Sequence, residues 1–201
     1  MTAPAQVAVL VSGGGTNLQA LLDALAGSSV ARVGRVVSSK ANAGALDRAR
    51  RAGVATVVLK DPADPRELAA ALDGMDLVVL AGYVKLVPRE VVARLRHRMI
   101  NIHPALLPEF GGPGMYGHHV HAAVLASGAA RSGATVHYVD EHYDRGPVIA
   151  RRTVPVLAGD TPDTLAQRVL AVEHELLPRV VLELAKRGVP EKAVRLEIEE
   201  E

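Results

Sequence analysis

The chain has 201 residues, with 23 Lys and Arg against 22 Asp and Glu, and it contains no Cys. Its near-zero net charge creates no field that attracts a polyanion, so we expect no nucleic-acid partner. Without Cys the chain forms no disulfide, has no thiolate nucleophile and offers no Cys ligand to zinc. The length fits one domain, or a core with a small appendage.

Hydrophobic residues make up 49% of the chain but aromatic residues only 2%. The core must therefore be built from Val, Leu, Ala and Ile, which is typical of a parallel sheet. The first apolar run ends at Ser12, and it is far too short for a signal peptide or a membrane-spanning segment. We expect a cytoplasmic protein that has no membrane partner.

In the first half, short Val-rich runs alternate with Ala-, Leu- and Arg-rich stretches of helical period, the pattern of strands joined by crossover helices. The predicted strands are 7–11, 35–38, 56–59, 77–80 and 99–102. The predicted helices are 17–26, 45–52, 65–72 and 88–95. This alternation predicts an α/β fold with a doubly wound, mostly parallel sheet in three layers.

After residue 102 the pattern changes. Residues 135–139 and 147–154 are predicted strands, and 161–186 is one long predicted helix with Pro178 inside it. We expect a single domain over residues 1–201, with one half to about residue 100, a second half to about residue 190, and an acidic tail over 191–201. The acidic residues from Glu197 onward are expected to be solvated.

A glycine-rich turn, Ser12-Gly13-Gly14-Gly15-Thr16-Asn17-Leu18, lies between the first strand and the first helix. Glycines let the backbone approach an anion closely, and N–H groups at a helix start can donate to a phosphate. A dinucleotide site fits less well, because it needs a third glycine where Leu18 stands and an acidic residue where Ser38-Ser39-Lys40 follows the second strand. The alternative is a tight strand-to-helix turn without a ligand.

The run Asn101-Ile102-His103-Pro104 ends the fifth predicted strand. Alternation along a strand points Asn101 and His103 the same way. An amide that holds a carbonyl oxygen beside an imidazole that donates a proton suits acyl transfer through a tetrahedral intermediate. The alternative is an incidental polar pair at a strand end.

An acidic loop, residues 140–147, lies between the two late strands. A carboxylate close to His103 would raise the pKa of the imidazole and help to move a proton from an attacking amine. We choose Asp144 for this role. The alternative is that Asp144 forms a turn before Gly146-Pro147.

Together these segments resemble the bacterial phosphoribosylglycinamide formyltransferases, from about residue 7 to about residue 187. The resemblance also includes residues 41–43, 48–50, 80–83 and 146–149. Methionyl-tRNA formyltransferases and formyltetrahydrofolate hydrolases are similar at the Asn-His motif but differ at the glycine-rich loop. The resemblance implies transfer of the formyl group of 10-formyltetrahydrofolate to the amine of 5-phosphoribosylglycinamide, a step of purine synthesis.

By this resemblance, Asn101 holds the formyl oxygen, His103 donates a proton, and Asp144 positions His103 and assists deprotonation of the amine. The amine attacks directly, without an acyl-enzyme or a metal. The resemblance places the substrate phosphate on Gly15, Thr16 and Asn17, with Glu173 near the glycinamide end. It implies these folate-binding residues: Arg66, Val84, Lys85, Leu86, Val87, Asn101, Asp140, Glu141, His142, Tyr143 and Asp144. The partners are small molecules, and a homodimer is left open.

Several points stay open at this level. The segment 66–76 is shorter than in many relatives, which leaves the match of Arg66 unsettled. The loop 110–117 is either a mobile lid or plain loop variation. His118, His119 and His121 suggest a metal, but no acidic partner matches them and we expect none; His119 matches a position near the substrate. Hydrolysis of the same folate, or binding without turnover, are the rival functions.

Overall fold

The computed structural model describes residues 3–189 and 192–197. Its strands are β1 (Ala5–Val11), β2 (Ala31–Ser38), β3 (Ala55–Val58), β4 (Leu77–Leu80), β5 (Met99–His103), β6 (Arg131–Tyr138) and β7 (Val148–Pro155). Its helices are α1 (Thr16–Leu25), α2 (Gly44–Arg51), α3 (Pro65–Ala71), α4 (Arg89–Arg94), α5 (His118–Ala126) and α6 (Pro162–Lys186). Among these described residues, no helix is long and apolar enough to cross a membrane.

The strands form one sheet in the order β3-β2-β1-β4-β5-β6-β7. Strands β1 to β5 pair in parallel, whereas β5 with β6 and β6 with β7 pair antiparallel. The chain therefore winds outward from β1 in one direction and from β4 in the other. This arrangement confirms the predicted doubly wound, mostly parallel sheet.

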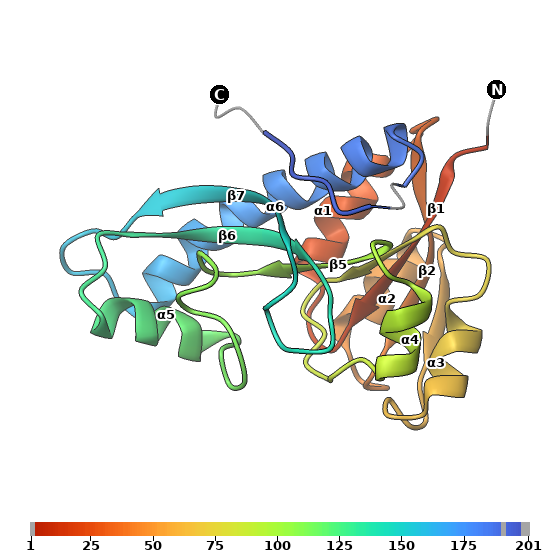
Figure 1. Ribbon diagram of the computed structural model, residues 1–201, viewed down its shortest axis with the longest axis horizontal. Coiled ribbons are helices and arrows are strands. Elements are labelled where there is room, and N and C mark those ends of the chain that lie inside the picture. The colour runs from red at the N-terminus through yellow and green to blue at the C-terminus, as the bar shows by residue number, and fades with distance from the viewer. Residues whose placement is uncertain (1–2, 190–191, 198–201) are drawn as a thin grey trace.

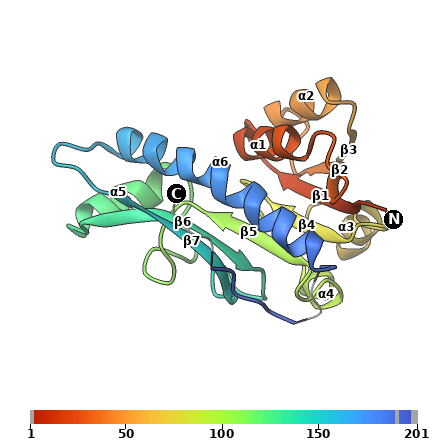
Figure 2. The same ribbon diagram turned by 90° about the horizontal axis from the view of Figure 1, so that it is seen from above.

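Helices cover both faces of the sheet, so the fold has three layers (Figure 1). One apolar core packs α1, α2, α5 and α6 against one face, and it includes Leu21, Leu176 and Val180. A second, smaller core packs α3 and α4 against the other face through Leu68 and Val91. Seen from above, α6 runs along the length of the molecule, on the same side as α1 and α2 (Figure 2). Buried Val and Leu fill both cores, as the composition predicts.

Glycines explain the two largest errors in the predicted strands. Strands β2 and β6 both begin four residues earlier than predicted, because each contains a glycine that the sequence pattern treats as a break. A side chain at Gly34 would contact the Oε1 atom of Gln6, and one at Gly133 would overlap the backbone of Arg152. Each glycine thus marks a close approach to a neighbouring strand rather than the end of its own.

Helix α5 is not among the predicted elements. Its sequence, HHVHAAVLA, has no acidic residue in the first turn, and its N-cap Gly117 provides no side-chain hydrogen bond. The signals that mark a helix start are therefore missing. By contrast, Asp64 caps α3 through the N–H of Arg66, and Thr161 forms a capping box with Thr164 at the start of α6.

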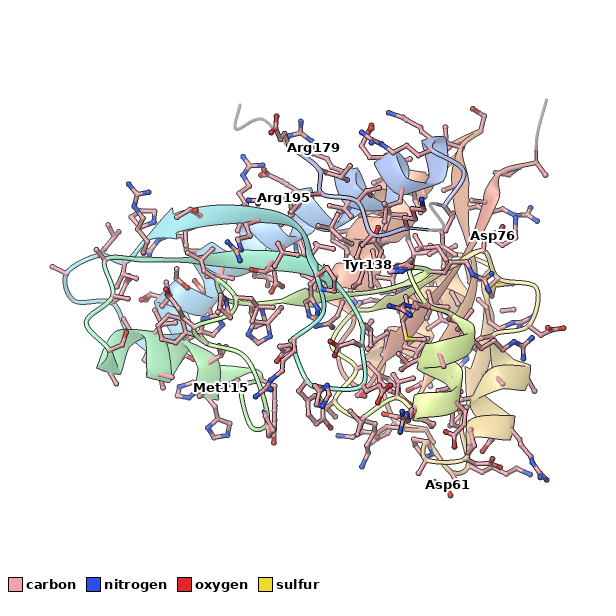
Figure 3. The ribbon with its side chains drawn as sticks, in the orientation of Figure 1. Asp61, Asp76, Met115, Tyr138, Arg179 and Arg195 are labelled. Atoms are coloured by element: carbon pink, nitrogen blue, oxygen red, sulfur yellow. The ribbon has the colours of Figure 1, made fainter. Side chains whose placement is uncertain are left out.

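Part of the predicted acidic tail, residues 191–201, packs against the rest of the molecule. Leu196 is buried in the larger core, and its N–H donates to the carbonyl of Ile149 on β7 at 2.8 Å. The N–H of Val194 donates to the hydroxyl of Tyr138 at 3.3 Å, and Tyr138 lies near the middle of the molecule (Figure 3). Glu197 is exposed, and the acidic residues 198–201 lie outside the described residues.

The loops after β1 and β4 lie side by side, where the winding of the sheet reverses. The N–H of Ser12 donates to the carbonyl of Gly82 at 3.1 Å, and the Ser12 hydroxyl accepts from the N–H of Val84 at 3.1 Å. Ligands of doubly wound sheets bind in the crevice at the carboxyl ends of strands at such a reversal. A ligand crevice is therefore expected beside the glycine-rich loop, at the carboxyl ends of β1 and β4.

Candidate active site

A cavity of about 900 Å³ lies at this edge of the sheet. Its walls come from the segments after β4 and β5, from the loop before α5, from the loop between β6 and β7, and from α1 and α6. Met115, in the loop before α5, belongs to this lining and is labelled in Figure 3. The volume suits a ligand of the size of a cofactor or a drug.

Asn101, His103 and Asp144 lie together in the wall of this cavity, as predicted. Nδ1 of His103 lies 3.5 Å from Oδ1 of Asp144, and both side chains are largely buried. Pro104 ends β5 after His103, and the hydroxyl of Thr135 donates to the carbonyl of Ala105 and accepts from the N–H of Leu107. These bonds hold the turn after β5, so the backbone that follows His103 is fixed in position.

The loop before α5 is tied to the two catalytic candidates through its backbone. Nε2 of His103 lies 2.7 Å from the carbonyl of Phe110, and the N–H of Gly112 donates to Oδ2 of Asp144 at 2.9 Å. A carbonyl only accepts, so Nε2 of His103 carries a proton. Asp144 itself has a φ of 57°, a left-handed conformation in which Asp is tolerated.

Asp144 acts to raise the pKa of His103, as expected, but the net pKa of this imidazole lies below its ordinary value. Burial lowers the pKa of His103, and the charge of Asp144 and the carbonyl of Phe110 oppose this effect without overcoming it. Burial also acts to raise the pKa of Asp144. The side-chain contact with His137, the charge of His103 when that ring is protonated and the N–H of Gly112 outweigh burial, so the pKa of Asp144 is lowered.

His137 is a site residue that the sequence analysis missed. It lies on β6 directly opposite Asn101 on β5, and its Nε2 is 3.0 Å from Nδ2 of Asn101 and 3.5 Å from Oδ1 of Asp144. The ring is buried and lines the cavity. Its only sequence signal is a His two residues beyond Thr135 in a predicted strand, and the pairing register that brings it to Asn101 is not visible in the sequence.

The glycine-rich loop presents a row of free N–H groups. Within the described chain, the N–H groups of residues 13–18 donate to no acceptor, whereas the carbonyl of Gly13 accepts from the N–H of Ala45 and that of Gly14 from Nε of Arg48. In a trans peptide the N–H points opposite to the carbonyl. The N–H groups of Gly14 and Gly15 therefore point away from α2, which makes this loop a cradle for an anion at the start of α1.

Arg48 is the second residue that the sequence analysis did not select. Its guanidinium donates from Nε to the carbonyl of Gly14 at 2.8 Å and from Nη1 to Oε1 of Gln19 at 3.2 Å. It thus holds the loop in shape and places a positive charge beside it. The N–H of Ala45, on the same helix, holds the preceding peptide in the same way.

Glu173 of α6 reaches the start of α1. Its Oε2 accepts from Nδ2 of Asn17 at 2.8 Å, and its side chain is buried in the cavity wall. Burial raises the pKa of Glu173 to about 7, although the Asn17 amide lowers it. Oδ1 of Asn17 is buried and has no partner among the described residues, so the pair keeps an acceptor for a ligand.

The structure brings most of the predicted site residues to the cavity but not all of them. Its lining includes Asn17, Val84, Lys85, Leu86, Val87, Asn101, His103, Asp140, His142, Tyr143, Asp144 and Glu173. Gly15 and Thr16 precede Asn17 without lining the cavity. Glu141 is not in the lining and pairs with Arg89 at 3.1 Å. Arg66 is exposed in the first turn of α3 and does not line the cavity.

The three His residues at the start of α5 lie in different surroundings. His118 and His121 line the cavity, and His121 is buried with its Nδ1 unpartnered among the described residues. His119 is exposed, packs edge-to-face on Tyr116 and does not line the cavity. No three His, Cys, Asp or Glu side chains of the described chain are grouped so that they could hold a metal ion.

Comparisons with known proteins identify relatives of this chain. Residues 5–181 match the family "Formyl transferase". The chain is 46% identical to a chloroplastic phosphoribosylglycinamide formyltransferase of Arabidopsis thaliana, over 88% of this chain and 64% of that protein. It is 40% identical to the phosphoribosylglycinamide formyltransferase of Escherichia coli, over 87% of this chain and 84% of that protein. The chain thus spans slightly less than two thirds of the plant relative.

Solved structures give the same result. The phosphoribosylglycinamide formyltransferase of Anaplasma phagocytophilum superposes with a TM-score of 0.85 at 37% identity, over 92% of this chain and 88% of that one. The enzyme of Brucella melitensis superposes with a TM-score of 0.83 at 41% identity, over 90% of this chain and 96% of that one. The chain therefore belongs to the formyl transferase family and, within it, to the phosphoribosylglycinamide formyltransferases.

Proposed function

We propose that this protein transfers the formyl group of 10-formyltetrahydrofolate to the amine of 5-phosphoribosylglycinamide. One observation carries the proposal: Asn101, His103 and Asp144 share a cavity with Asn17 and Glu173, which adjoin the free N–H groups of the glycine-rich loop. An acyl-transfer site thus lies in a cavity whose wall adjoins an anion cradle at Asn17. A phosphorylated amine fits this arrangement, because its phosphate and its nucleophile need different surroundings.

The chemistry proceeds by direct attack. The amine nitrogen forms a bond to the formyl carbon, and the electron pair of the carbonyl bond moves to oxygen. Asn101 and His103, two residues apart on β5, stabilise this oxyanion by donating hydrogen bonds. The bond from carbon to the folate nitrogen then breaks, the folate nitrogen gains a proton, and the amine loses one.

His103 and Asp144 serve the proton transfers. In the structure, the Nε2 proton of His103 is donated to the carbonyl of Phe110, so a substrate oxygen must take the place of that carbonyl. Asp144 stays ionised, because its pKa is lowered, and it supports the imidazolium when His103 carries a second proton. The absence of Cys from the sequence agrees with a route without a thioester.

The part of the cavity that we assign to the folate carries exposed apolar side chains. Val84 and Leu86 are 42% and 51% exposed and line the cavity after β4, and Tyr143 is 40% exposed in the loop after β6. Exposed apolar side chains beside a cavity suit an aromatic ring system. Lys85, Val87, Asp140 and His142 complete this part of the cavity. The roles of Arg66 and Glu141 stay predictions, since neither lines the cavity.

A steady-state assay with both substrates tests the proposal. Release of tetrahydrofolate that requires the ribonucleotide supports formyl transfer. Release of formate from the folate alone would instead support a hydrolase, and binding of either compound without turnover would leave a binding module. A variant with Asn101→Ala and His103→Ala together serves as the inactive control.

Other expectations stay predictions. Because one sheet runs through both halves of the chain, we expect residues 1–201 to form a single formyltransferase domain. A cytoplasmic location is tested by fractionating cells that produce the protein, and the homodimer by sedimentation of the purified chain.

A further inference from the structure

We propose that His137 is a positioning residue that fixes the orientation of the Asn101 amide. The unprotonated Nε2 of His137 accepts from Nδ2 of Asn101, which leaves the second N–H of that amide for the substrate oxygen. This inference rests on the proposed function, because it assigns a role in holding the formyl oxygen. It adds a residue to the site whose side chain need not touch the substrate.

The hydrogen bonds of the ring determine which nitrogen carries the proton. Nδ1 of His137 lies 2.8 Å from the carbonyl of Tyr138. A carbonyl only accepts, so Nδ1 is the donor. In the neutral ring the second nitrogen, Nε2, then carries a lone pair, and Nδ2 of Asn101 lies 3.0 Å from it.

A second group competes for the same nitrogen. Oδ1 of Asp144 lies 3.5 Å from Nε2 of His137, and it would favour a proton there. The two groups make opposite demands: the Asn101 amide N–H needs a lone pair, whereas the carboxylate needs an N–H. At 3.0 Å the contact to Asn101 has hydrogen-bond length, and at 3.5 Å the contact to Asp144 is too long for a good hydrogen bond. The distances therefore favour the neutral ring that accepts from Asn101.

The fold makes this contact rigid. Asn101 and His137 are directly opposite each other in the antiparallel pair of β5 and β6, so their side chains lie on the same face of the sheet. The His137 side chain is only 3% exposed, which leaves little room for another rotamer. The oxygen and the NH2 group of an Asn amide have similar shapes, so either could face the substrate. A neighbour that can only accept a hydrogen bond binds the NH2 group and thereby fixes the orientation of the amide.

Nuclear magnetic resonance of nitrogen-labelled protein tests the inference without any assay. The neutral Nδ1–H form of His137 near neutral pH, assigned by loss of the signal in His137→Gln, is the expected result. A doubly protonated ring, or a neutral ring with its proton on Nε2, would overturn the inference. This measurement stands even if the wild-type protein shows no formyl transfer, in which case the proposed function fails separately.

Kinetics of two substitutions test the role itself. His137→Leu removes the acceptor, and kcat should fall about tenfold while the KM values change little, as one lost positioning hydrogen bond implies. His137→Gln offers Oε1 as an acceptor and should recover a large part of this loss. Thermal unfolding verifies that each variant is folded, and if His137→Leu is not, the comparison is made with His137→Met.

A double-mutant cycle separates positioning from a general structural effect. In an Asn101→Ala background, His137→Leu should lower kcat by less than about twofold, because the amide that it positions is gone. Equal losses in both backgrounds would show that His137 acts independently of Asn101, and the inference would be wrong.

Discussion

Nδ2 of Asn17, in the first turn of α1, lies 2.8 Å from Oε2 of Glu173 in the middle of α6. This bond joins the segment after the glycine-rich loop to the long helix α6, which runs along much of the length of the molecule (Figure 2). It also buries a carboxyl group beside the anion cradle. A neutral Glu173 would not repel a phosphate or a ribose oxygen, and the raised pKa keeps part of the population neutral near pH 7.

Glu173→Gln should alter how stability depends on pH. The pKa of Glu173 is raised from 4.5 to about 7 in the folded protein, so the folded state binds more protons than the unfolded state between these values. Stability of the wild type should therefore fall as the pH rises through this window, by about 3 kcal/mol. Glu173→Gln should remove this part of the fall. Thermal unfolding from pH 4 to pH 8 measures it.

The matched control is Glu109→Gln, which changes an exposed carboxylate. It should leave the pH dependence of stability as in the wild type. Parallel curves for the wild type and Glu173→Gln would mean that Glu173 titrates normally in the folded protein.

Gly15→Ala should damage the anion cradle. Gly15 has a φ of 75°, and a Cβ atom there would lie 2.5 Å from the Cβ atom of Ala45. Left-handed strain together with this overlap should cost about 2 kcal/mol of stability. Gly13→Ala is the control, since nothing lies within 4 Å of a Cβ atom at Gly13, and its melting temperature should stay near that of the wild type. Similar melting temperatures for both variants would contradict the geometry of the loop.

Arg48→Ala should weaken binding of the ribonucleotide more than it slows turnover. The substitution removes the hydrogen bond that fixes the Gly14 peptide and a positive charge beside the loop. We expect KM for the ribonucleotide to rise about tenfold, as for the loss of one charge-assisted hydrogen bond. Arg50→Ala, on the same helix, removes a largely exposed Arg paired with Asp47 and should leave KM unchanged. An equal rise in both variants would indicate that only overall charge matters.

The sequence predicts the parts of the site that lie next to one another along the chain. Asn101 and His103 are two residues apart at the end of β5, and the glycine-rich loop directly follows β1, so strand alternation and turn composition are enough to find them. Fold class follows from the same alternation of strands and helices. These signals are local in the sequence, and the structure has the corresponding strands and loop at these positions.

The missed residues depend on contacts between distant segments. His137 meets Asn101 only through the register of β5 and β6, and Arg48 meets Gly14 only through the packing of α2 on the loop. No pattern within either segment reports such a pairing. The net direction of the His103 pKa shift could not be predicted for a related reason: burial depends on the whole fold, and here it outweighs the effect of the nearby Asp144.

His103→Ala should lower kcat by about a hundredfold to ten-thousandfold, the usual range for loss of a general acid or base. The variant should remain folded, because His103 lies at the end of β5 and the turn after it is held by Thr135. His119→Ala is the control, since this exposed His does not line the cavity, and its kcat should stay within about twofold of the wild type. A large loss of kcat in His119→Ala with little loss in His103→Ala would show that His119, and not His103, has the catalytic role.

Asp144→Asn should move the basic limb of the kcat profile to lower pH. Burial lowers the pKa of His103, and Asp144 opposes this effect by stabilising the imidazolium. Without the carboxylate, the pKa of His103 should fall further, so His103 should lose its second proton at a lower pH. Steady-state rates from pH 5 to pH 9 measure the shift. A basic limb at an unchanged pH would show that the imidazolium of His103 does not limit turnover.

The central claim is that the formyl group passes from the folate to the amine of the ribonucleotide. The most direct test gives the purified protein a folate with an isotopically labelled formyl carbon, together with 5-phosphoribosylglycinamide, and follows the label by nuclear magnetic resonance. The account predicts that the label appears as a formamide on the glycinamide nitrogen, and that Asn101→Ala and His103→Ala slow its appearance. Label that appears as free formate, at the same rate with or without the ribonucleotide, would contradict it.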